Sequence, residues 1–232
     1  MGKRIIQQRR GRGGSVYRVR SKAGEYRPGY LADIKGEWEV VKLLPSPGHS
    51  VPLAKIKNRE GKVFYNFACN HLFVGQKINF GGRNPGDISK IGELKNGTRI
   101  FNIENRAGDG GKLVRSGGNS AEIINKSEEV VTVWMPSRRE KKFSADCRAT
   151  VGVAAGSGKK DKPVLKAGKK FYIMKSKSKL WPKTSAVSMN AIDHPFGSGR
   201  GKRVKSKIAK RYAAPGKKVG MIRPKRTGRK KR

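Results

Sequence analysis

Acidic residues are absent from both ends of this chain, and this segregation of charge constrains its fold more than any other feature. None precedes Glu25 and none follows Asp193, whereas 16 acids lie from Glu25 to Asp193. The first 24 residues carry 8 lysines or arginines, and residues 197–232 carry 16. Such segments bury too little apolar surface to fold alone. Their positive charges also repel one another until a polyanion neutralises them. We therefore expect a folded, moderately basic body between two extended basic ends.

The formal net charge of +39 indicates an anionic partner, and nucleic acid fits better than a membrane or an acidic protein. With glycine counted, the longest uninterrupted apolar run is six residues, Val151–Gly156, far shorter than a membrane-spanning helix. The N-terminal sequence has no apolar core for a signal peptide, so the cytoplasm is the expected location. Two cysteines are too few for a disulfide framework. Matching basic clusters at both termini favour nucleic-acid binding over solvated tails.

Residues 38–80 show a repeated strand pattern with almost no helix signal. Val63, Tyr65, Phe67 and Cys69 alternate with other residues, which predicts that these four share one face of a strand. Several short strands at this spacing predict a small closed or partly open barrel. The expected strands are Trp38–Leu44, Val51–Lys57, Val63–Cys69 and Gln76–Phe80, with a hairpin turn at residues 58–61.

A second strand-rich region follows residues 81–97, which we interpret as a connector because glycine, proline and asparagine dominate it. A long glycine-rich loop, residues 105–118, interrupts this region, and residues 154–170 are rich in glycine and lysine. The predicted fold class is therefore all-β, with two small barrels. The expected elements are strands over Thr98–Glu104, Glu122–Asn125, Val131–Met135 and Phe143–Val153, and a weak helix over Gly168–Ser178.

Two motifs suggest nucleotide or metal chemistry, but neither has the full spacing. Gly156-Ser157-Gly158-Lys159 has Val153 where a phosphate loop needs glycine, and Lys160 where it needs Ser or Thr. Its amides and lysines remain suited to RNA phosphates. Cys69-Asn70-His71 offers two zinc ligands where a structural site needs four, and Cys147, His49 and His194 are far away in sequence. We therefore expect no metal and no cofactor, and a buried strand end at Cys69.

In the stretch MNAIDHPFGSGRGKR, residues 189–203, the chain changes from a mixture of acidic and basic residues to basic residues without acids. His194 follows Asp193 directly, which permits an acid–base pair, although adjacent side chains tend to point apart. Pro195 fixes the backbone beyond it, so a rigid turn that leads glycines and arginines into RNA is the favoured interpretation. Trp181 lies in a basic stretch, where it either stacks on an unpaired base or packs against the second barrel.

Three stretches are distinctive when taken together. They are Gly108-Asp109-Gly110-Gly111-Lys112 with Leu113-Val114-Arg115 and Ser120-Ala121, Cys147-Arg148-Ala149-Thr150-Val151-Gly152, and Met189-Asn190-Ala191-Ile192-Asp193-His194-Pro195. In these stretches, and in their order and spacing, the chain resembles the universal L-two family of large-subunit ribosomal proteins. The resemblance covers nearly the whole chain. The N-terminal arm and the ending Lys225–Arg229 are similar to the archaeal or eukaryotic branch.

The resemblance implies an oligonucleotide-binding barrel, then a Src-homology-three-like barrel, then an extended C-terminal segment. It implies a primary binder of 23S-type ribosomal RNA in the cytoplasmic ribosome, beside neighbouring ribosomal proteins and the small subunit at the subunit interface. Support of subunit association, of tRNA binding and of the peptidyl-transferase region is implied too, with tRNA as a further partner. No membrane contact and no homo-oligomer are expected.

In bacterial relatives a second histidine typically stands at the place that Phe196 occupies here. A catalytic hypothesis that needs both histidines therefore does not carry over, and His194 is expected to be at most a supporting residue near the peptidyl-transferase region. The resemblance thus implies a protein that is not an enzyme. Two alternatives stay open: an RNA-processing enzyme that uses Asp193 and His194, and a free barrel-domain translation factor.

Four segments and one set of RNA-contacting residues are predicted. The segments are a basic arm (1–24), the oligonucleotide-binding barrel (25–84), the Src-homology-three-like barrel with basic loops (85–188) and an RNA-penetrating segment (189–232). The residues expected to contact RNA are Arg9, Arg10, Arg12, Arg106, Lys112, Arg115, Arg148, Lys159, Lys160, Trp181, Asn190, His194, Arg200, Lys202 and Arg203.

Overall fold

The computed structural model describes residues 2–19, 21–32, 36–159, 161–198 and 207–223. The chain divides into two compact units, and each is described by itself. The barrel unit is Arg20–Lys177, and the terminal unit is Met1–Val19 together with Ser178–Arg232. No helix in the described ranges is long and apolar enough to cross a bilayer. The division into four segments made from the sequence stays a prediction.

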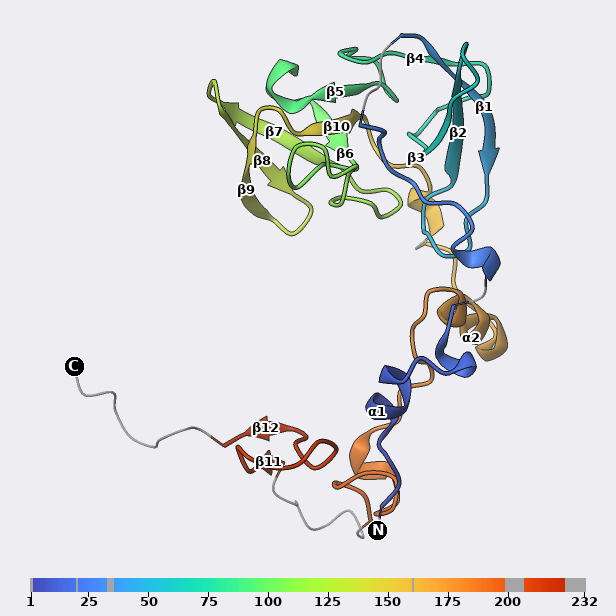
Figure 1. The fold of residues 1–232 in the computed structure, drawn as a ribbon, viewed down its shortest axis with the longest axis vertical. Helices are drawn as coiled ribbons and strands as arrows, with labels where there is room; N and C mark the ends of the chain where they lie inside the picture. Colours follow the sequence, from blue (N-terminus) through green and yellow to red (C-terminus); the bar gives the residue numbers. More distant parts are fainter. Residues whose placement is uncertain (1, 20, 33–35, 160, 199–206, 224–232) are drawn as a thin grey trace, which may run out of the picture. The chain divides into compact units, whose positions relative to one another are not determined.

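Two curled antiparallel sheets make up most of the barrel unit (Figure 1), which confirms the all-β fold class with two barrels. The first sheet has the strand order β3-β2-β1-β4, and the second has the order β5-β10-β6-β7-β8-β9. Helix α2, Ala167–Ser176, follows the second sheet and confirms the weak helix predicted there. The strands are β1 Trp38–Leu44, β2 Leu53–Asn58, β3 Val63–Phe67, β4 Lys77–Ile78, β5 Ile88–Lys90, β6 Arg99–Phe101, β7 Ala121–Lys126, β8 Val130–Met135, β9 Arg139–Ser144 and β10 Arg148–Val151.

Alternating polarity explains why these segments form strands. In β1, Trp38 and Val40 are buried while Glu39 between them is exposed. In β8, Val131 and Val133 are buried in the core of the second sheet, as their spacing predicts. One face of each strand thus covers a core and the other meets water, which fixes the register because a slip by one residue would invert both faces.

Val63, Tyr65 and Phe67 are alternate residues of β3, as predicted, but burial does not follow that alternation. Val63 is 37% exposed, whereas its neighbour Phe64 is buried with its ring 5.0 Å from the ring of Trp38. Further along, Phe67 and Cys69 are buried in a different cluster. Both faces of this strand are covered towards its end, because it lies between the core of its own sheet and the second sheet. Alternation along the sequence cannot identify the inner face of a strand that is buried on both sides.

The interpretation of residues 81–97 as a connector is also wrong. This stretch contains β5 and a 3-10 turn, and Ile88, Ile91 and Leu94 are each no more than 1% exposed. Gly81 and Gly97, each with a φ near +80°, form turns at its two ends. The glycines therefore mark the ends of short buried elements, so a high glycine content did not indicate an unstructured linker.

The two sheets meet through a small apolar cluster and a buried polar network. The apolar cluster includes Leu53 from β2 and Phe101 from β6. In the network, the Tyr30 hydroxyl donates to the Asn102 carbonyl and lies 2.7 Å from Thr150 Oγ1. Asn66 of β3 donates from Nδ2 to the same Thr150 oxygen over 3.1 Å. Buried groups bonded in this way fix one orientation of the sheets, because any shift would leave them without partners.

Replacing Tyr30 with phenylalanine is expected to lower the free energy of unfolding by about 1–3 kcal/mol, since the carbonyl of Asn102 and the hydroxyl of Thr150 would each lose a buried partner. Urea unfolding of the full chain, followed by tryptophan fluorescence, measures the change. Tyr212, which is 93% exposed, supplies the control, and Tyr212→Phe is expected to leave the midpoint unchanged. Equal midpoints for the two variants would contradict a structural role for the network.

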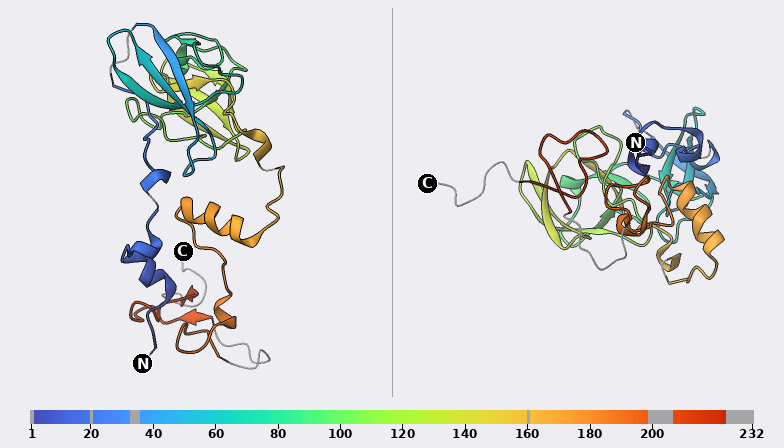
Figure 2. Two further views of the ribbon diagram at one scale, coloured as in Figure 1. Left: turned by 90° about the vertical axis from the view of Figure 1, so that its right-hand side faces the viewer. Right: turned by 90° about the horizontal axis from the view of Figure 1, so that it is seen from below.

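Three segments come together in the terminal unit: the N-terminal arm, residues 186–198 and residues 207–223. Helix α1, Ile6–Gly11, lies in the arm, where composition did not predict a helix. Its start is fixed because the Ile5 N–H donates to Gln8 Oε1 over 3.2 Å. The Lys3 N–H donates to the Ile192 carbonyl over 2.8 Å, and Figures 1 and 2 show the arm beside this segment. In residues 207–223, β11 (Ile208–Ala209) and β12 (Met221–Ile222) form a parallel pair. This part of the C-terminal segment therefore folds back on itself and does not run as a single extended chain.

Candidate nucleic-acid interface

A buried carboxylate shapes the glycine-rich loop of residues 105–118. The side chain of Glu104 is fully buried. Its oxygens accept the backbone N–H groups of Gly108 (3.2 Å), Gly110 (2.9 Å) and Arg148 (2.8 Å). A carboxylate that accepts several backbone N–H groups stabilises the turn around it. The acid before the loop therefore organises backbone and presents no negative charge to a ligand.

Asp109, the acid within the loop, has the same role. Its carboxylate accepts the N–H groups of Asn105 (3.0 Å), Arg106 (3.3 Å) and Gly111 (3.0 Å). Gly111 has a φ of +88°, and a Cβ there would lie 2.5 Å from Asn102 Oδ1. The Gly-Asp-Gly-Gly motif is thus a turn that needs glycine for close approach and aspartate for its hydrogen bonds.

Arg148 was predicted to contact RNA, but the structure places its guanidinium inside the barrel unit. Its Nη2 donates to Glu104 Oε1 over 2.8 Å, and its Nη1 donates to the Leu31 carbonyl over 2.7 Å. The side chain is 16% exposed and lies over the ring of Tyr30. These contacts join β10 to the chain that precedes β1. The guanidinium of Arg148 thus donates its hydrogen bonds to groups within the barrel unit. RNA contact by this residue stays an untested prediction.

Arg115 also faces inward. Its Nη2 donates to the Pro28 carbonyl over 3.3 Å, and its guanidinium carbon lies 4.6 Å from the ring centroid of Phe67. Burial lowers the pKa of this guanidinium, although it remains charged at neutral pH. The side chain holds the loop against the first sheet, so its RNA contact is likewise an untested prediction.

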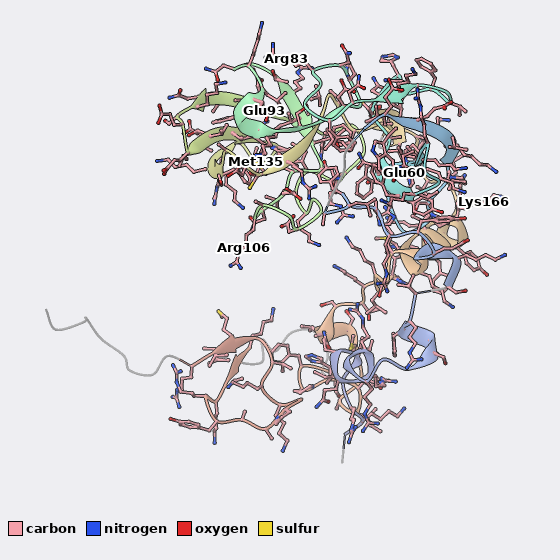
Figure 3. The ribbon with its side chains drawn as sticks, turned by 45° about the horizontal axis from the view of Figure 1, so that its top comes forward. Glu60, Arg83, Glu93, Arg106, Met135 and Lys166 are labelled. Atoms are coloured by element: carbon pink, nitrogen blue, oxygen red, sulfur yellow. The ribbon has the colours of Figure 1, made fainter. Side chains whose placement is uncertain are left out.

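Arg106, Lys112 and Lys159 are exposed on two loops that lie side by side. The Gly118 N–H donates to the Ala154 carbonyl over 2.8 Å, which joins the loop of residues 105–118 to the segment that carries Lys159. Figure 3 shows Arg106 projecting away from its loop. The three cations make no ion pair with any described acid. They are thus exposed cations without an acidic partner among the described residues; Lys160 lies outside those residues.

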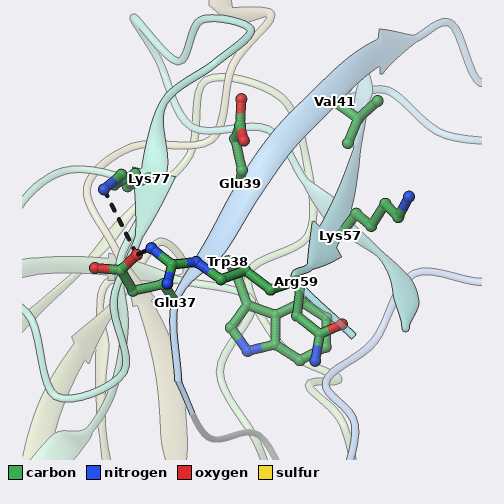
Figure 4. A pocket seen from close by; sticks show the side chains of 8 residues that line it. Glu37, Trp38, Glu39, Val41, Lys57, Arg59 and Lys77 are labelled. Carbon is green, nitrogen blue, oxygen red and sulfur yellow. Dashed lines mark hydrogen bonds and ion pairs between the residues drawn. The ribbon is translucent and has the colours of Figure 1, made fainter. Parts of the chain in front are cut away.

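Some cations of the barrel unit already have an acidic partner. A pocket on the first sheet is lined by Glu37, Arg59 and Lys77 among others (Figure 4). Glu37 Oε2 lies 2.9 Å from Arg59 Nη2 and 3.5 Å from Lys77 Nζ. A cation with a local carboxylate partner has less to gain from a phosphate, so these side chains contrast with the unpaired Arg106, Lys112 and Lys159.

Three predicted arginines, Arg9, Arg10 and Arg12, are exposed at the end of α1 in the terminal unit. Arg9 Nε donates to the Arg4 carbonyl over 3.1 Å, and Arg10 Nη2 donates to the Ser178 carbonyl over 3.3 Å. Cations in the last turn also complement the helix dipole. None of the three pairs with a described acid, so their charge remains available to an anion.

The segment around His194 is a compact turn. The Asn190 carbonyl accepts the N–H groups of Asp193 (3.0 Å) and His194 (3.2 Å), and the Ser198 N–H donates to the Met189 carbonyl over 2.8 Å. A Cβ on Gly197 would overlap the Asn190 carbonyl, so this glycine is needed for close approach. Asn190 is exposed and Trp181 is half-buried. Arg200, Lys202 and Arg203 lie outside the described residues.

The imidazole of His194 is buried, and it pairs with the backbone rather than with Asp193. Its Nδ1 accepts the Phe196 N–H over 3.0 Å, and the two rings meet edge to face at 5.1 Å. Within the described residues Asp193 makes no hydrogen bond to this ring. The nitrogen that an orienting carboxylate would hold is therefore occupied, which disfavours the acid–base pair that the sequence left open.

The described residues give no support to a metal site or to a phosphate loop. They contain no group of three or more His, Cys, Asp or Glu side chains that could hold a metal ion. Burial raises the pKa of the Cys69 and Cys147 thiols, which disfavours the thiolate needed by a nucleophile or a zinc ligand. Ser157–Lys159 forms a single 3-10 turn, without the long helix that follows a phosphate loop.

Helix α2 is a basic element that the sequence prediction did not assign to RNA. Lys169 and Lys170 are exposed on it, and so are the rings of Phe171 and Tyr172, at 41% and 59%. Exposed aromatic rings beside lysines are typical of surfaces that stack on unpaired bases. Ser176 Oγ donates to the Pro47 carbonyl over 3.1 Å, which holds the helix at the turn before β2. The sequence signal was this interleaving of lysine with aromatic residues.

Comparison with known proteins identifies similar chains along the full length. Residues 84–214 match the family model described as Ribosomal Proteins L2, C-terminal domain. The chain is 43% identical to the large ribosomal subunit protein uL2 of Methanocaldococcus jannaschii, over 98% of this chain and 99% of that protein. It is 41% identical to the protein of the same name from Hyperthermus butylicus, over the whole of both chains. A third such protein, from Methanothermobacter thermautotrophicus, is 39% identical over the whole of both chains.

Proposed function

The chain belongs to the L2 family of ribosomal proteins, and on this premise we propose that it is a structural constituent of the large subunit of cytoplasmic ribosomes, where it binds ribosomal RNA. Its proposed partners are 23S-type RNA and neighbouring ribosomal proteins, with the small subunit at the subunit interface and tRNA as further partners. Support of subunit association, of tRNA binding and of the peptidyl-transferase region belongs to the same proposal. No membrane contact and no homo-oligomer are proposed.

One observation carries the proposal: the acids near the glycine-rich loop turn inward while its outer cations stay free. Glu104 and Asp109 bind backbone N–H groups, whereas Arg106 and Lys112 are exposed without an acidic partner among the described residues. The loop thus gains a fixed shape and presents only positive charge. A preformed cationic loop binds a phosphate surface at a lower entropic cost than a flexible one.

The proposed mechanism divides the work between the two units. The barrel unit fixes the register on one RNA surface through Arg106, Lys112, Lys159 and helix α2. The terminal unit adds Arg9, Arg10 and Arg12, and the segment 189–232 passes between RNA helices. One cationic chain then bridges RNA segments that would otherwise repel each other. The protein acts here by binding, and His194 has a structural role in the turn that it forms with Phe196.

Binding should weaken steeply with salt if this proposal holds. Six of the cations predicted to contact RNA are exposed and have no acidic partner among the described residues: Arg9, Arg10, Arg12, Arg106, Lys112 and Lys159. If each neutralises one phosphate, a plot of log K against log salt concentration should have a slope of about −4 to −5. Filter binding of the full chain to large-subunit RNA measures that slope.

Three outcomes would contradict the proposal. A slope near zero would exclude phosphate neutralisation as the main source of affinity. Recovery of the chain mainly in the ribosome-free fraction, after washes at moderate salt, would favour a free translation factor. Multiple turnover on naked RNA that is abolished by His194→Ala would favour an enzyme. We expect none of these results.

A further inference from the structure

The terminal unit contains a pocket in which only His194 was predicted to contact RNA, and no ligand was predicted for the pocket itself. It has a volume of about 710 Å³, which is within the range of small-molecule sites. Three stretches far apart in sequence line it: residues 2–8, residues 191–195 and residues 215–217. We call it the terminal pocket. Its wall is held by the Lys3–Ile192 backbone hydrogen bond and by Gln8, whose amide packs against Gly216.

The lining of the terminal pocket combines cations with apolar walls. Lys3, Arg4 and Lys217 contribute positive charge, and no acid is present among the described residues that line it. Ile5, Pro195 and Pro215 contribute apolar surface. Positive charge beside a flat apolar wall suits a ligand with an anionic end and a planar end, and a nucleotide is such a ligand.

His194 supplies a hydrogen-bond donor with a defined tautomer. Its Nδ1 accepts the Phe196 N–H, so the proton of the neutral imidazole must reside on Nε2. His194 lines the terminal pocket although only 8% of the residue is exposed. No hydrogen bond within the described residues uses the Nε2 atom. The Phe196 contact also fixes the ring, which preorganises this donor.

We propose that the terminal pocket holds one nucleotide unit of RNA, with its base against the proline walls, the edge of that base at His194 Nε2 and its phosphate at the cations. This inference rests on the proposed function and adds a subsite for a single unstacked nucleotide. The base would accept a hydrogen bond from His194 Nε2. In this role His194 is a positioning and binding residue, and the N-terminal arm becomes part of the same site.

Nucleoside monophosphates test the pocket apart from the rest of the RNA surface. The chain has three histidines, His49, His71 and His194, so their imidazole signals can be followed by NMR in the full chain. On titration with 5′-AMP or 5′-UMP, the His194 signals are expected to shift while those of His49 and His71 stay in place. Inorganic phosphate is expected to cause a smaller shift, because it lacks the base.

A matched pair of variants locates the effect. Ala191 lines the pocket, and Ala191→Trp is expected to weaken mononucleotide binding about tenfold or more, as the loss of one stacked base does. Val187 is 47% exposed in the same unit and does not line the pocket, so Val187→Trp is expected to bind like the wild type. Equal loss in both variants would overturn the assignment of the site to this pocket.

Further outcomes separate this inference from the proposed function. If no mononucleotide moves the His194 signals while the chain still binds ribosomal RNA with a steep salt dependence, the terminal pocket is not a nucleotide site and the proposed function stands. An equal response to inorganic phosphate and to 5′-AMP would also overturn the nucleotide assignment. If the chain fails to bind ribosomal RNA at low salt, the proposed function itself falls, and this inference falls with it.

Discussion

Replacing Glu104 with alanine is expected to lower the free energy of unfolding by about 3–5 kcal/mol, the cost of leaving a buried charge without its partner. The Glu104 side chain is fully buried and Arg148 is 16% exposed, so water cannot replace the lost carboxylate. Three backbone N–H groups, those of Gly108, Gly110 and Arg148, would lose their acceptor as well. Chemical denaturation of the full chain, followed by tryptophan fluorescence, measures the change.

Glu37 provides the matched control. Its ion pair with Arg59 has nearly the same length, 2.9 Å, but both side chains are at least half exposed. Glu37→Ala is therefore expected to cost less than about 1 kcal/mol. Similar losses for Glu37→Ala and Glu104→Ala would show that burial does not decide the strength of these pairs.

The pH dependence of stability offers a second test of the role of Glu104. Burial by itself would raise the pKa of Glu104, but hydrogen bonds from the Arg148 side chain and from backbone N–H groups outweigh it, so the pKa lies below its usual value. A lowered pKa means that the carboxylate stabilises the fold above the unfolded pKa of about 4.3 and ceases to do so as the pH falls through the lower folded pKa. The difference in stability between wild type and Glu104→Gln should therefore shrink below about pH 4.

Replacing Arg9, Arg10 and Arg12 together with glutamine is expected to weaken binding to large-subunit RNA on the order of a hundredfold at 0.1 M salt. Each arginine is exposed and none pairs with a described acid, so each can neutralise one phosphate. The slope of log K against log salt concentration should become shallower by about 2–3. Filter binding over a range of salt concentrations measures both quantities.

A second triple variant removes the same charge from a different surface. Arg59, Lys62 and Lys77 each lie within 3.5 Å of an acid on the first sheet. Their replacement by glutamine is expected to leave the salt slope unchanged, because they already have carboxylate partners. If both triple variants weaken binding equally, net charge alone determines the affinity and the arm has no special place in the interface.

Local patterns predicted many of the elements correctly. The expected strand Trp38–Leu44 has the bounds of β1, and the alternation of Val131 and Val133 identified the buried face of β8. The weak helix expected at Gly168–Ser178 is close to α2. These elements each have one buried face, so the order of polar and apolar residues along the chain reports directly on the environment.

The errors arose where distant contacts decide the environment. Phe64 is buried in the core of its own sheet, whereas Phe67 lies in the cluster that joins the two sheets. Similarly, β5 lies in a stretch that the glycine content predicts to be a connector. Arg148 looked like other arginines in a basic chain. Its donors turn inward only because Glu104 and Leu31, 44 and 117 residues away, lie beside it.

The sequence by itself determined the fold class, the family resemblance and the segregation of charge that points to RNA. All three can be recognised from the order of residues, from short motifs or from composition. Recognising them does not require knowing which residues are neighbours in space. The tertiary structure alone decided which cations are free and which are internal, and it alone brought residues 2–8, 191–195 and 215–217 around one pocket. The physical reason is that a side chain's partner depends on chain segments brought together by folding, and one sequence of charges is compatible with many such arrangements.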